Sequence, residues 1–254
     1  MAGAAVLGRL SDGRLSWRVA TVREVVPETA HAATLVLDVD GWPGHRAGQH
    51  VDVRLTAEDG YQAQRSYSIA SAPESATIGL TVERVEDGEV SPYLVDELRA
   101  GDQFELRGPI GGHFTWSVED GGPLLLVAGG SGLAPLMAML RHRAARGSDV
   151  EVAVLVSART AADALYRDEL ATLAGGPGLD VTWTFTRGGP AGWTGFARRV
   201  DADMLAAVAP APARRARCFV CGPTPFVERV TGLLVDAGHD ARLIHAERFG
   251  PTGS

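Results

Sequence analysis

The chain has 254 residues, a formal net charge of −7, 45% hydrophobic residues and 22% charged residues. This length suits two compact domains, and the composition is that of an ordinary globular protein. The acidic balance argues against a nucleic-acid partner. All 24 basic residues are Arg, which excludes Schiff-base lysine chemistry and a P-loop lysine.

The charge is divided unequally along the chain. Residues 1–118 hold 10 Arg against 17 Asp and Glu, whereas residues 119–254 hold 14 of each. The neutral second half is therefore the better candidate for binding an anionic ligand. We predict one domain in residues 1–118 and another in residues 119–254.

The cysteines and histidines predict neither a disulfide framework nor a metal site. Cys218 and Cys221 are too few for a four-Cys cluster, and in a strand residues three apart point to opposite faces, which disfavours a redox pair. The seven His show no metal-ligand spacing. No apolar run approaches the roughly 20 residues of a membrane span, and the N-terminus does not resemble a signal peptide. We expect a cytoplasmic monomer with no membrane span.

The first half is predicted to form short strands separated by Gly, Pro and Asp, a pattern that is typical of an antiparallel barrel or sandwich. The expected strands are residues 17–26, 34–39, 50–55, 78–85 and 102–106. One helix is expected at residues 91–98, with Ser91 as its N-cap and Pro92 at its first position.

The second half follows a turn-rich linker at residues 120–123 and alternates apolar strands with amphipathic helices. The expected strands are residues 123–128, 151–157, 180–185 and 218–220, and the expected helices are residues 134–146, 164–174, 204–208 and 225–237. This alternation predicts a doubly wound parallel sheet.

A glycine-rich turn, Gly129-Gly130-Ser131-Gly132, joins the first of these strands to a helix. Such a turn lets the backbone approach a pyrophosphate, and the helix N-terminus that follows favours an anion. It is not the G-x-G-x-x-G fingerprint, because Pro135 stands at the third glycine position. An ordinary tight strand-to-helix turn is the alternative.

The first half contains Arg65-Ser66-Tyr67-Ser68. Arg65 can fork onto a phosphate, Tyr67 can stack on a flat ring, and Ser68 can hydrogen bond to a heteroatom. A half-buried strand with a satisfied Arg is the alternative.

These motifs, taken in order, resemble the ferredoxin–NADP reductase superfamily over roughly residues 16–252. The stretch from Arg65 to Ser68 is similar to the flavin motif R-x-Y-[ST], and the glycine-rich turn is similar to the dinucleotide loop AGGTGIAP. Four further segments resemble, in order, the flavin-phosphate loop, the GPxGxF turn, the CGP motif and the E-x-F-G ending of some members: residues 88–91, 108–114, 221–223 and 247–250. The GPxGxF-like turn has one extra residue.

The resemblance implies an antiparallel Greek-key β-barrel that binds FAD, followed by a doubly wound α/β domain that binds NAD(P). It implies that Arg65 holds the FAD pyrophosphate, that Tyr67 stacks on the flavin or ribityl chain, and that Ser68 hydrogen bonds near flavin N5. The remaining flavin contacts that it implies are Ser66, Gly88, Val90 and Ser91.

For the nicotinamide cofactor the resemblance implies that Gly130, Ser131 and Gly132 face the pyrophosphate and that Cys221, Gly222 and Pro223 lie beside the nicotinamide. Glu247 and Phe249 are placed near the other face of the flavin. Ser68, Cys221 and Glu247 are then the expected catalytic residues.

The choice between NADPH and NADH depends on the end of the second expected strand, where a doubly wound sheet places the adenosine ribose. Ser157 and Arg159 follow that strand, with Arg167 as a further contact, and these residues favour NADPH through its 2′-phosphate. A surface pair between Arg159 and Asp163 is the alternative.

The predicted activity is that of a flavin oxidoreductase. It takes a hydride from NADPH or NADH onto FAD and passes electrons to a separate ferredoxin, oxygenase or cytochrome P450 component. A reductase of free flavin or another small acceptor and an electron-transfer subunit of a larger complex stay open as alternatives. An α/β-hydrolase is disfavoured by the strand-rich first half.

Overall fold

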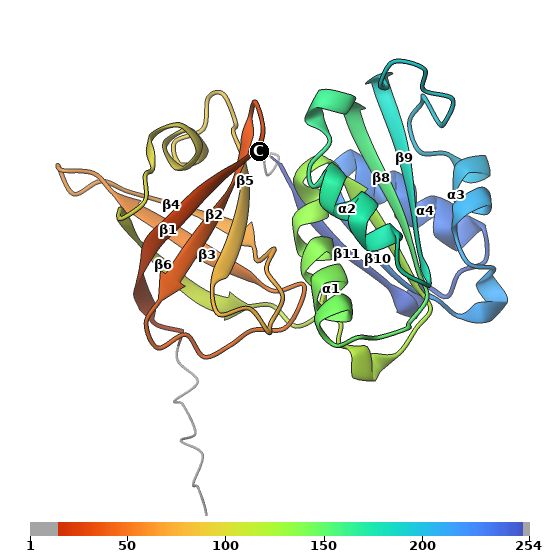
Figure 1. Cartoon of the computed structure of the whole chain (residues 1–254), viewed down its shortest axis with the longest axis horizontal. Coiled ribbons are helices and arrows are strands. Elements are labelled where there is room, and N and C mark those ends of the chain that lie inside the picture. Colours follow the sequence, from red (N-terminus) through yellow and green to blue (C-terminus); the bar gives the residue numbers. More distant parts are fainter. Residues whose placement is uncertain (1–14, 251–254) are drawn as a thin grey trace, which may run out of the picture.

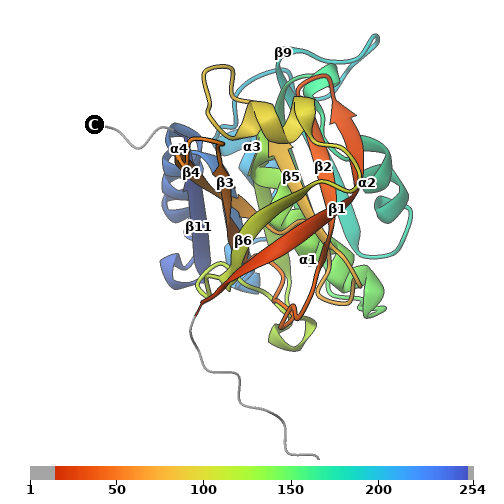
Figure 2. The ribbon, with the colours of Figure 1, turned by 90° about the vertical axis from the view of Figure 1, so that its left-hand side faces the viewer.

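The computed structural model describes residues 15–250, which form two domains lying side by side (Figure 1). The first is built on a six-stranded antiparallel sheet and the second on a five-stranded parallel sheet. The two-domain architecture predicted from the sequence is confirmed. Seen from its end in Figure 2, the first domain lies in front of the second.

The first sheet closes into a barrel. Its strands run in the order β4-β3-β6-β1-β2-β5, and an antiparallel bridge between Ile69 and Leu80 joins its two ends. This single bridge brings the two edge strands together, and the side chains of one face fill the interior. The strands are β1 (Trp17–Thr29), β2 (Ala32–Val39), β3 (His50–Thr56), β4 (Gln62–Ser68), β5 (Ile78–Glu83) and β6 (Gln103–Ile110).

The expected helix at residues 91–98 is present over residues 91–97, but its cap is different. A single π-helical turn, η1 (Tyr93–Glu97), has Pro92 at its N-cap position, with no side-chain capping bond. The Ser91 hydroxyl instead accepts the N–H of Val85 at 3.0 Å. The predicted role of Ser91 as a helix cap is therefore wrong, because its hydroxyl closes the preceding loop.

The second sheet has the strand order β11-β10-β7-β8-β9, with every neighbouring pair parallel. Its strands are β7 (Leu124–Gly129), β8 (Val152–Thr160), β9 (Leu179–Gly188), β10 (Arg217–Pro223) and β11 (Ile244–Phe249). Its helices are α1 (Leu133–Ala145), α2 (Arg167–Ala174), α3 (Ala202–Val208) and α4 (Thr224–Asp236). Strand β11 was not among the strands expected from the sequence.

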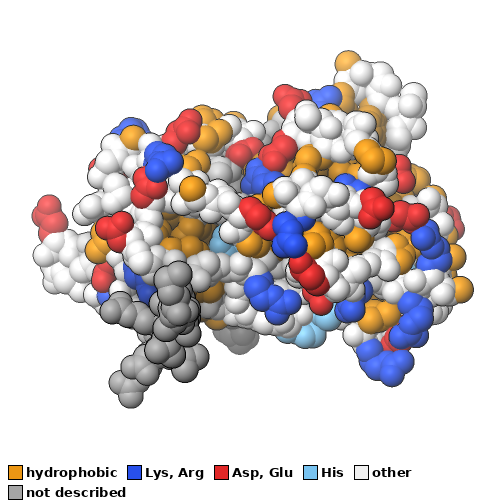
Figure 3. Space-filling view, turned by 60° about the horizontal axis from the view of Figure 1, so that its bottom comes forward, with side chains coloured by type: hydrophobic (Ala, Val, Ile, Leu, Met, Phe, Trp, Pro, Cys, Tyr) orange, Lys and Arg blue, Asp and Glu red, His pale blue; other side chains and the backbone are white. Residues whose placement is uncertain are grey.

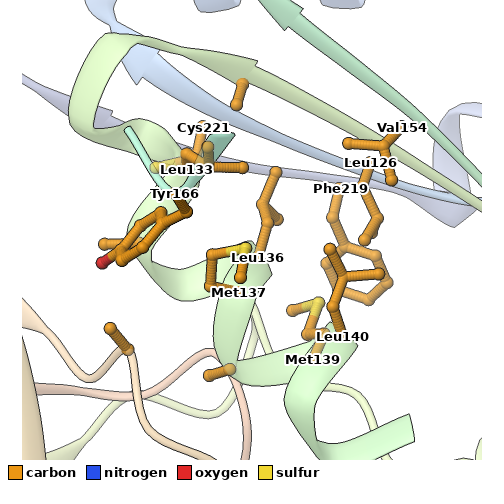
Figure 4. Packing of buried hydrophobic residues seen from close by; sticks show 14 of the residues in the cluster. Leu126, Leu133, Leu136, Met137, Met139, Leu140, Val154, Tyr166, Phe219 and Cys221 are labelled. Atoms are coloured by element: carbon orange, nitrogen blue, oxygen red, sulfur yellow. The ribbon is translucent and has the colours of Figure 1, made fainter. Parts of the chain in front are cut away.

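The helices cover both faces of the second sheet (Figure 1). Buried side chains of α1 and α2 pack on one face together with first-domain residues such as Phe114 and Trp116, whereas α3 and α4 pack on the other. Figure 4 shows the leucines and methionines of α1 meeting Phe219 and Cys221 of β10. One core therefore continues from the second domain into the first.

Cys218 and Cys221 lie on opposite faces of this sheet. Cys218 belongs to the core beneath α3 and α4, and Cys221 to the core beneath α1. Both are buried free thiols. The expectation that β10 directs them apart is confirmed.

Two surface properties complete the description. Acidic and basic side chains are interspersed over the face shown in Figure 3. Within residues 15–250, no helix is long and apolar enough to cross a membrane.

Candidate functional site

The glycine-rich turn lies at the carboxyl end of β7, beside the carboxyl end of β10. Strand order reverses between these two strands, which is where doubly wound sheets bind ligands. A short 3-10 turn, η3 (Gly130–Gly132), leads from β7 into α1, and Gly130 has a φ of +56°. The turn therefore stands at the expected place for a phosphate-binding backbone.

Packing against β10 fixes the shape of this turn. A Cβ on Gly132 would lie 2.2 Å from the backbone oxygen of Cys221, and a Cβ on Gly222 would lie 3.2 Å from Cα of Gly129. Only residues without a side chain allow the two strand ends to approach so closely. The dinucleotide-loop motif and the Cys221-Gly222-Pro223 motif therefore form one packed unit.

A cavity of about 430 Å³ opens in front of this unit, between the two domains. The second domain lines it with seven of the predicted cofactor residues or their neighbours, namely Gly129, Gly130, Ser131, Ser157, Arg159, Pro223 and Phe249. Part of the facing wall comes from the first domain through His31, Glu83 and Arg84. A glycine turn, hydroxyl groups and an Arg at one cavity are groups that fit a dinucleotide.

Some predicted residues lie away from this cavity. Arg167 is exposed on α2 and is not part of the cavity lining. Cys221 and Gly222 are buried and do not line the cavity either. Asp163 was the possible surface partner of Arg159. Its carboxylate instead accepts the N–H and the hydroxyl of Thr160 at 2.9 and 2.6 Å. Within residues 15–250 no ion pair joins Arg159 to Asp163, and Arg159 is exposed.

The flavin motif and the expected flavin-phosphate loop meet at an ion pair. Arg65 on β4 approaches Glu89 with an Nη2–Oε2 distance of 3.1 Å, and Glu89 also accepts the hydroxyl of Tyr61 at 2.8 Å. Both side chains of the ion pair are about half exposed. One terminal nitrogen of Arg65 thus donates to Glu89, and the other donates to the carbonyl oxygen of Gln64 at 2.7 Å.

The other residues of the flavin motif and of the expected flavin-phosphate loop differ in burial and in hydrogen bonding. Ser66 donates to Asp52 at 2.7 Å, which occupies its hydroxyl within the barrel wall. Tyr67 is half-buried, and burial raises its pKa to about 12, so its ring stays neutral. Val90 is buried, with 1% of its surface exposed. Gly88 and Ser91 flank it in the loop.

The two predicted catalytic residues of the second domain are neighbours. Cys221 on β10 and Glu247 on β11 are paired in the parallel register. Burial raises the pKa of Glu247 to about 7. Burial and, secondarily, the Glu247 charge raise the pKa of the Cys221 thiol, so it stays a neutral thiol and not a nucleophile. No hydrogen bond in the described chain joins Ser68 to either residue.

Sequence reasoning missed the first-domain side of the site. On β5, Thr81 and Glu83 point to the same face, and both lie toward the second domain. Glu83 comes close to the glycine turn: a Cβ on Gly130 would lie 3.7 Å from its Oε2. Strand alternation could have grouped these two residues, but no sequence signal shows which domain packs there.

These features define an oxidoreductase with one flavin domain and one nicotinamide domain. Residues 19–116 match the family model of an oxidoreductase FAD-binding domain, and residues 126–231 match that of an oxidoreductase NAD-binding domain. The chain belongs to the ferredoxin–NADP reductase superfamily.

Two curated proteins are similar in sequence. Ferredoxin–NADP reductase B of Sorangium cellulosum is 37% identical over 80% of this chain and 84% of its own length. The glycine betaine monooxygenase reductase subunit of Pseudomonas aeruginosa is 33% identical over 82% of this chain. The match spans a little over half, 57%, of the length of that subunit.

A solved structure agrees with the sequence matches. The Amycolatopsis cytochrome P450 reductase superposes with a TM-score of 0.81 at 30% identity, covering 94% of this chain and 71% of that one.

Proposed function

We propose that this chain transfers a hydride from NAD(P)H to FAD and then delivers electrons to a separate acceptor. The observation that carries the proposal is the cavity at the domain junction, because it joins the glycine turn and Arg159 of one domain to the wall of the flavin-binding barrel. Bound FAD would accept the hydride and release its electrons. The protein's own part is to bind and align the two cofactors.

Each group of residues has a separate task in this proposal. Arg65 and the loop around Val90 hold the FAD phosphates, while Tyr67 packs against the flavin and Ser68 orients it. The glycine turn holds the dinucleotide pyrophosphate, and Cys221 with Glu247 shapes the dry pocket in which the nicotinamide lies. The boundary between the domains is proposed at residues 118 and 119, within the connection from β6 to β7.

The acceptor is proposed to be a protein of the oxygenase or cytochrome P450 type. The support comes from two similar proteins, one named as the reductase subunit of a monooxygenase and the other as a cytochrome P450 reductase. A small acceptor such as free flavin is the second possibility, in keeping with the open cleft between the domains.

The decisive experiment is an absorption spectrum of the purified protein followed by stopped-flow mixing with NADH and with NADPH. The protein is expected to be yellow, to release FAD on denaturation, and to bleach with at least one nicotinamide. Catalytic turnover with added free flavin but not with ferredoxin or cytochrome would select the second acceptor class. A colourless protein that does not take up FAD would overturn the proposal.

A further inference from the structure

Arg141 on α1 forms a hydrogen bond from the second domain to the segment that directly follows the flavin-motif strand β4. Its Nη1 donates to the carbonyl oxygen of Ala70 at 2.8 Å. Ala70 comes two residues after Ser68, and Ile69 between them belongs to the bridge that closes the barrel. The same helix begins at the glycine turn, so one rigid element connects the dinucleotide-binding backbone to the flavin strand.

Two neighbours fix the orientation of the Arg141 guanidinium. The carboxylate of Glu169 accepts Nε and Nη2 at 2.7 and 2.6 Å, and the guanidinium carbon lies 5.0 Å from the ring centroid of Tyr166. A forked carboxylate and an aromatic face leave little freedom to a planar guanidinium. The remaining donor group is therefore held toward Ala70 before any cofactor binds.

Tyr166 makes a second polar contact to the first domain. Its hydroxyl is hydrogen bonded to Thr81 of β5, whose hydroxyl lies 2.7 Å from that of Thr34 on β2. Figure 4 shows the Tyr166 hydroxyl directed out of the hydrophobic cluster. The backbone of Tyr166 has a φ of +52°, a left-handed conformation that is strained for a bulky residue. Such strain persists only where the surrounding contacts hold the residue in place.

We propose that Arg141, oriented by Glu169 and Tyr166, is a positioning residue that sets the dinucleotide domain against the flavin strand for hydride transfer. This inference rests on the proposed function. Arg141 lies outside the cavity of the glycine turn and lines a separate groove of about 420 Å³ at the domain junction. Its loss should therefore disturb alignment and leave dinucleotide affinity intact.

Alignment has a kinetic signature that a stabilising contact lacks. A misplacement of about 1 Å between reacting atoms can cost roughly a hundredfold in rate. A residue that aligns the cofactors changes the limiting rate constant, whereas loss of uniform binding changes the Michaelis constant. The test must therefore separate the limiting rate of flavin reduction from the affinity for each cofactor.

The same helix offers a matched control. Arg143 also donates from its guanidinium to carbonyl oxygens, but these belong to Val150 and Pro177, both in the second domain. Arg141→Lys and Arg143→Lys each keep the charge and remove the guanidinium fork. They differ in whether the lost contact crosses the domain junction.

The experiment measures four quantities on FAD-loaded protein. These are the FAD content, the dissociation constant of the oxidised nicotinamide by calorimetry, the limiting rate of flavin reduction, and the long-wavelength charge-transfer absorbance of the reduced enzyme with oxidised nicotinamide. Arg141→Lys should lower the limiting rate by roughly tenfold to a hundredfold and weaken the absorbance, with less than a twofold change in the dissociation constant. Arg143→Lys should leave the rate within about twofold.

The possible outcomes separate this inference from the proposed function. If wild type is reduced and Arg141→Lys is reduced at a similar rate, or if both Lys variants slow equally, Arg141 is not a positioning residue. If wild type itself is never reduced, the proposed function fails. Should Arg141→Lys fold poorly, Glu169→Gln replaces it, because it removes the forked carboxylate that orients Arg141. Slower reduction in Glu169→Gln with unchanged dinucleotide affinity supports the inference, and a wild-type rate overturns it.

Discussion

In the proposed function the two domains bind phosphate through different kinds of group. In the first domain the group is a side chain, Arg65, which is half exposed and paired with Glu89. In the second it is the backbone of the glycine turn, which close packing against β10 holds in one shape. The proposed first site is a side chain that already has an ion partner, whereas the proposed second site is a backbone turn that is already formed. Changes to the second should therefore act through packing, and changes to the first through affinity.

The largest expected effect comes from a side chain placed at the preformed turn. Gly132→Ala puts a Cβ 2.2 Å from the Cys221 backbone oxygen, so β10 and α1 must move apart. We expect a loss of about 3 kcal/mol or more in the free energy of unfolding, together with a large loss of dinucleotide affinity. Denaturant unfolding and calorimetric titration measure the two effects.

The control for this variant is a glycine with open space. A Cβ on Gly232, within α4, would meet nothing within 4 Å. Gly232→Ala should keep or raise stability, because alanine favours a helix. Equal losses in the two variants would contradict the packing argument for the turn.

The next effect concerns Glu247, which is half-buried on β11 beside Cys221. Burial raises its pKa from an ordinary value of 4.5 to about 7. The folded chain then binds a proton that the unfolded chain has released, so stability falls as pH rises from 4.5 to about 7 and is level above that. In Glu247→Gln the free energy of unfolding should not show this decrease. Against wild type at pH 8 the variant should gain up to about 3 kcal/mol in unfolding free energy.

Unfolding of the FAD-free protein at several pH values measures this difference. Subtracting wild type from the variant cancels the titration of all other groups. The gain should vanish by about pH 4, where both forms of the position are neutral. A difference that does not change with pH would show that Glu247 is solvated in solution.

The side-chain site of the first domain is tested by Arg65→Ala. Loss of a charge-assisted phosphate contact should weaken FAD binding by about 1.5–3 kcal/mol, with little change in unfolding of the FAD-free protein. Fluorescence titration of the apoprotein with FAD measures this. Glu89→Gln frees Arg65 from its ion partner and should bind FAD at least as tightly as wild type. Weaker binding by Glu89→Gln would mean that the ion pair orients Arg65 and does not compete for it.

Much of the fold could be predicted from the sequence because its signals are local. The alternation of strands and helices in residues 119–254 indicated the parallel sheet, and the apolar strand β7 with its glycine turn indicated a backbone that could approach a pyrophosphate. Strand β11 was missed because most of its side chains are half-buried or exposed, which leaves only a weak apolar pattern. The Ser91 cap was wrong because a hydroxyl has several backbone N–H groups within reach.

The candidate site also contains residues with a local sequence signal and residues without one. Motif residues such as Ser157 and Arg159 could be named because they follow a strand that the sequence identifies. Glu83, Arg141 and Tyr166 could not, since their roles depend on contacts between domains that are distant in sequence. The sequence does not show which residues of the two domains face each other. Only the packed structure brings these side chains together.

The smallest expected effect is at Arg159. Its side chain is a proposed phosphate contact in the second domain, where the other proposed phosphate contact is the backbone of the glycine turn. Arg159 lines the cavity with Ser157 at the end of β8 and is exposed. The Asp163 carboxylate, which could have neutralised it, is bonded to Thr160. A 2′-phosphate at this position would therefore meet an available guanidinium. We propose a preference for NADPH over NADH that Arg159→Ala lowers by roughly tenfold, which corresponds to about 1.4 kcal/mol.

The ratio of kcat/KM for the two nicotinamides measures this preference and cancels effects on FAD content or folding. In Arg159→Ala the value for NADPH should fall while that for NADH holds, because NADH has no phosphate to lose. Arg167→Ala is the matched control: Arg167 is also exposed but stands on α2, outside the cavity lining, and its removal should leave the ratio unchanged. A wild type that uses both nicotinamides equally, or a ratio that moves with Arg167 and not with Arg159, would place the phosphate contact elsewhere. If wild type uses both nicotinamides equally, the second domain does not read a 2′-phosphate through Arg159, and its glycine turn keeps the main phosphate contact in contrast to the Arg side chain of the first domain.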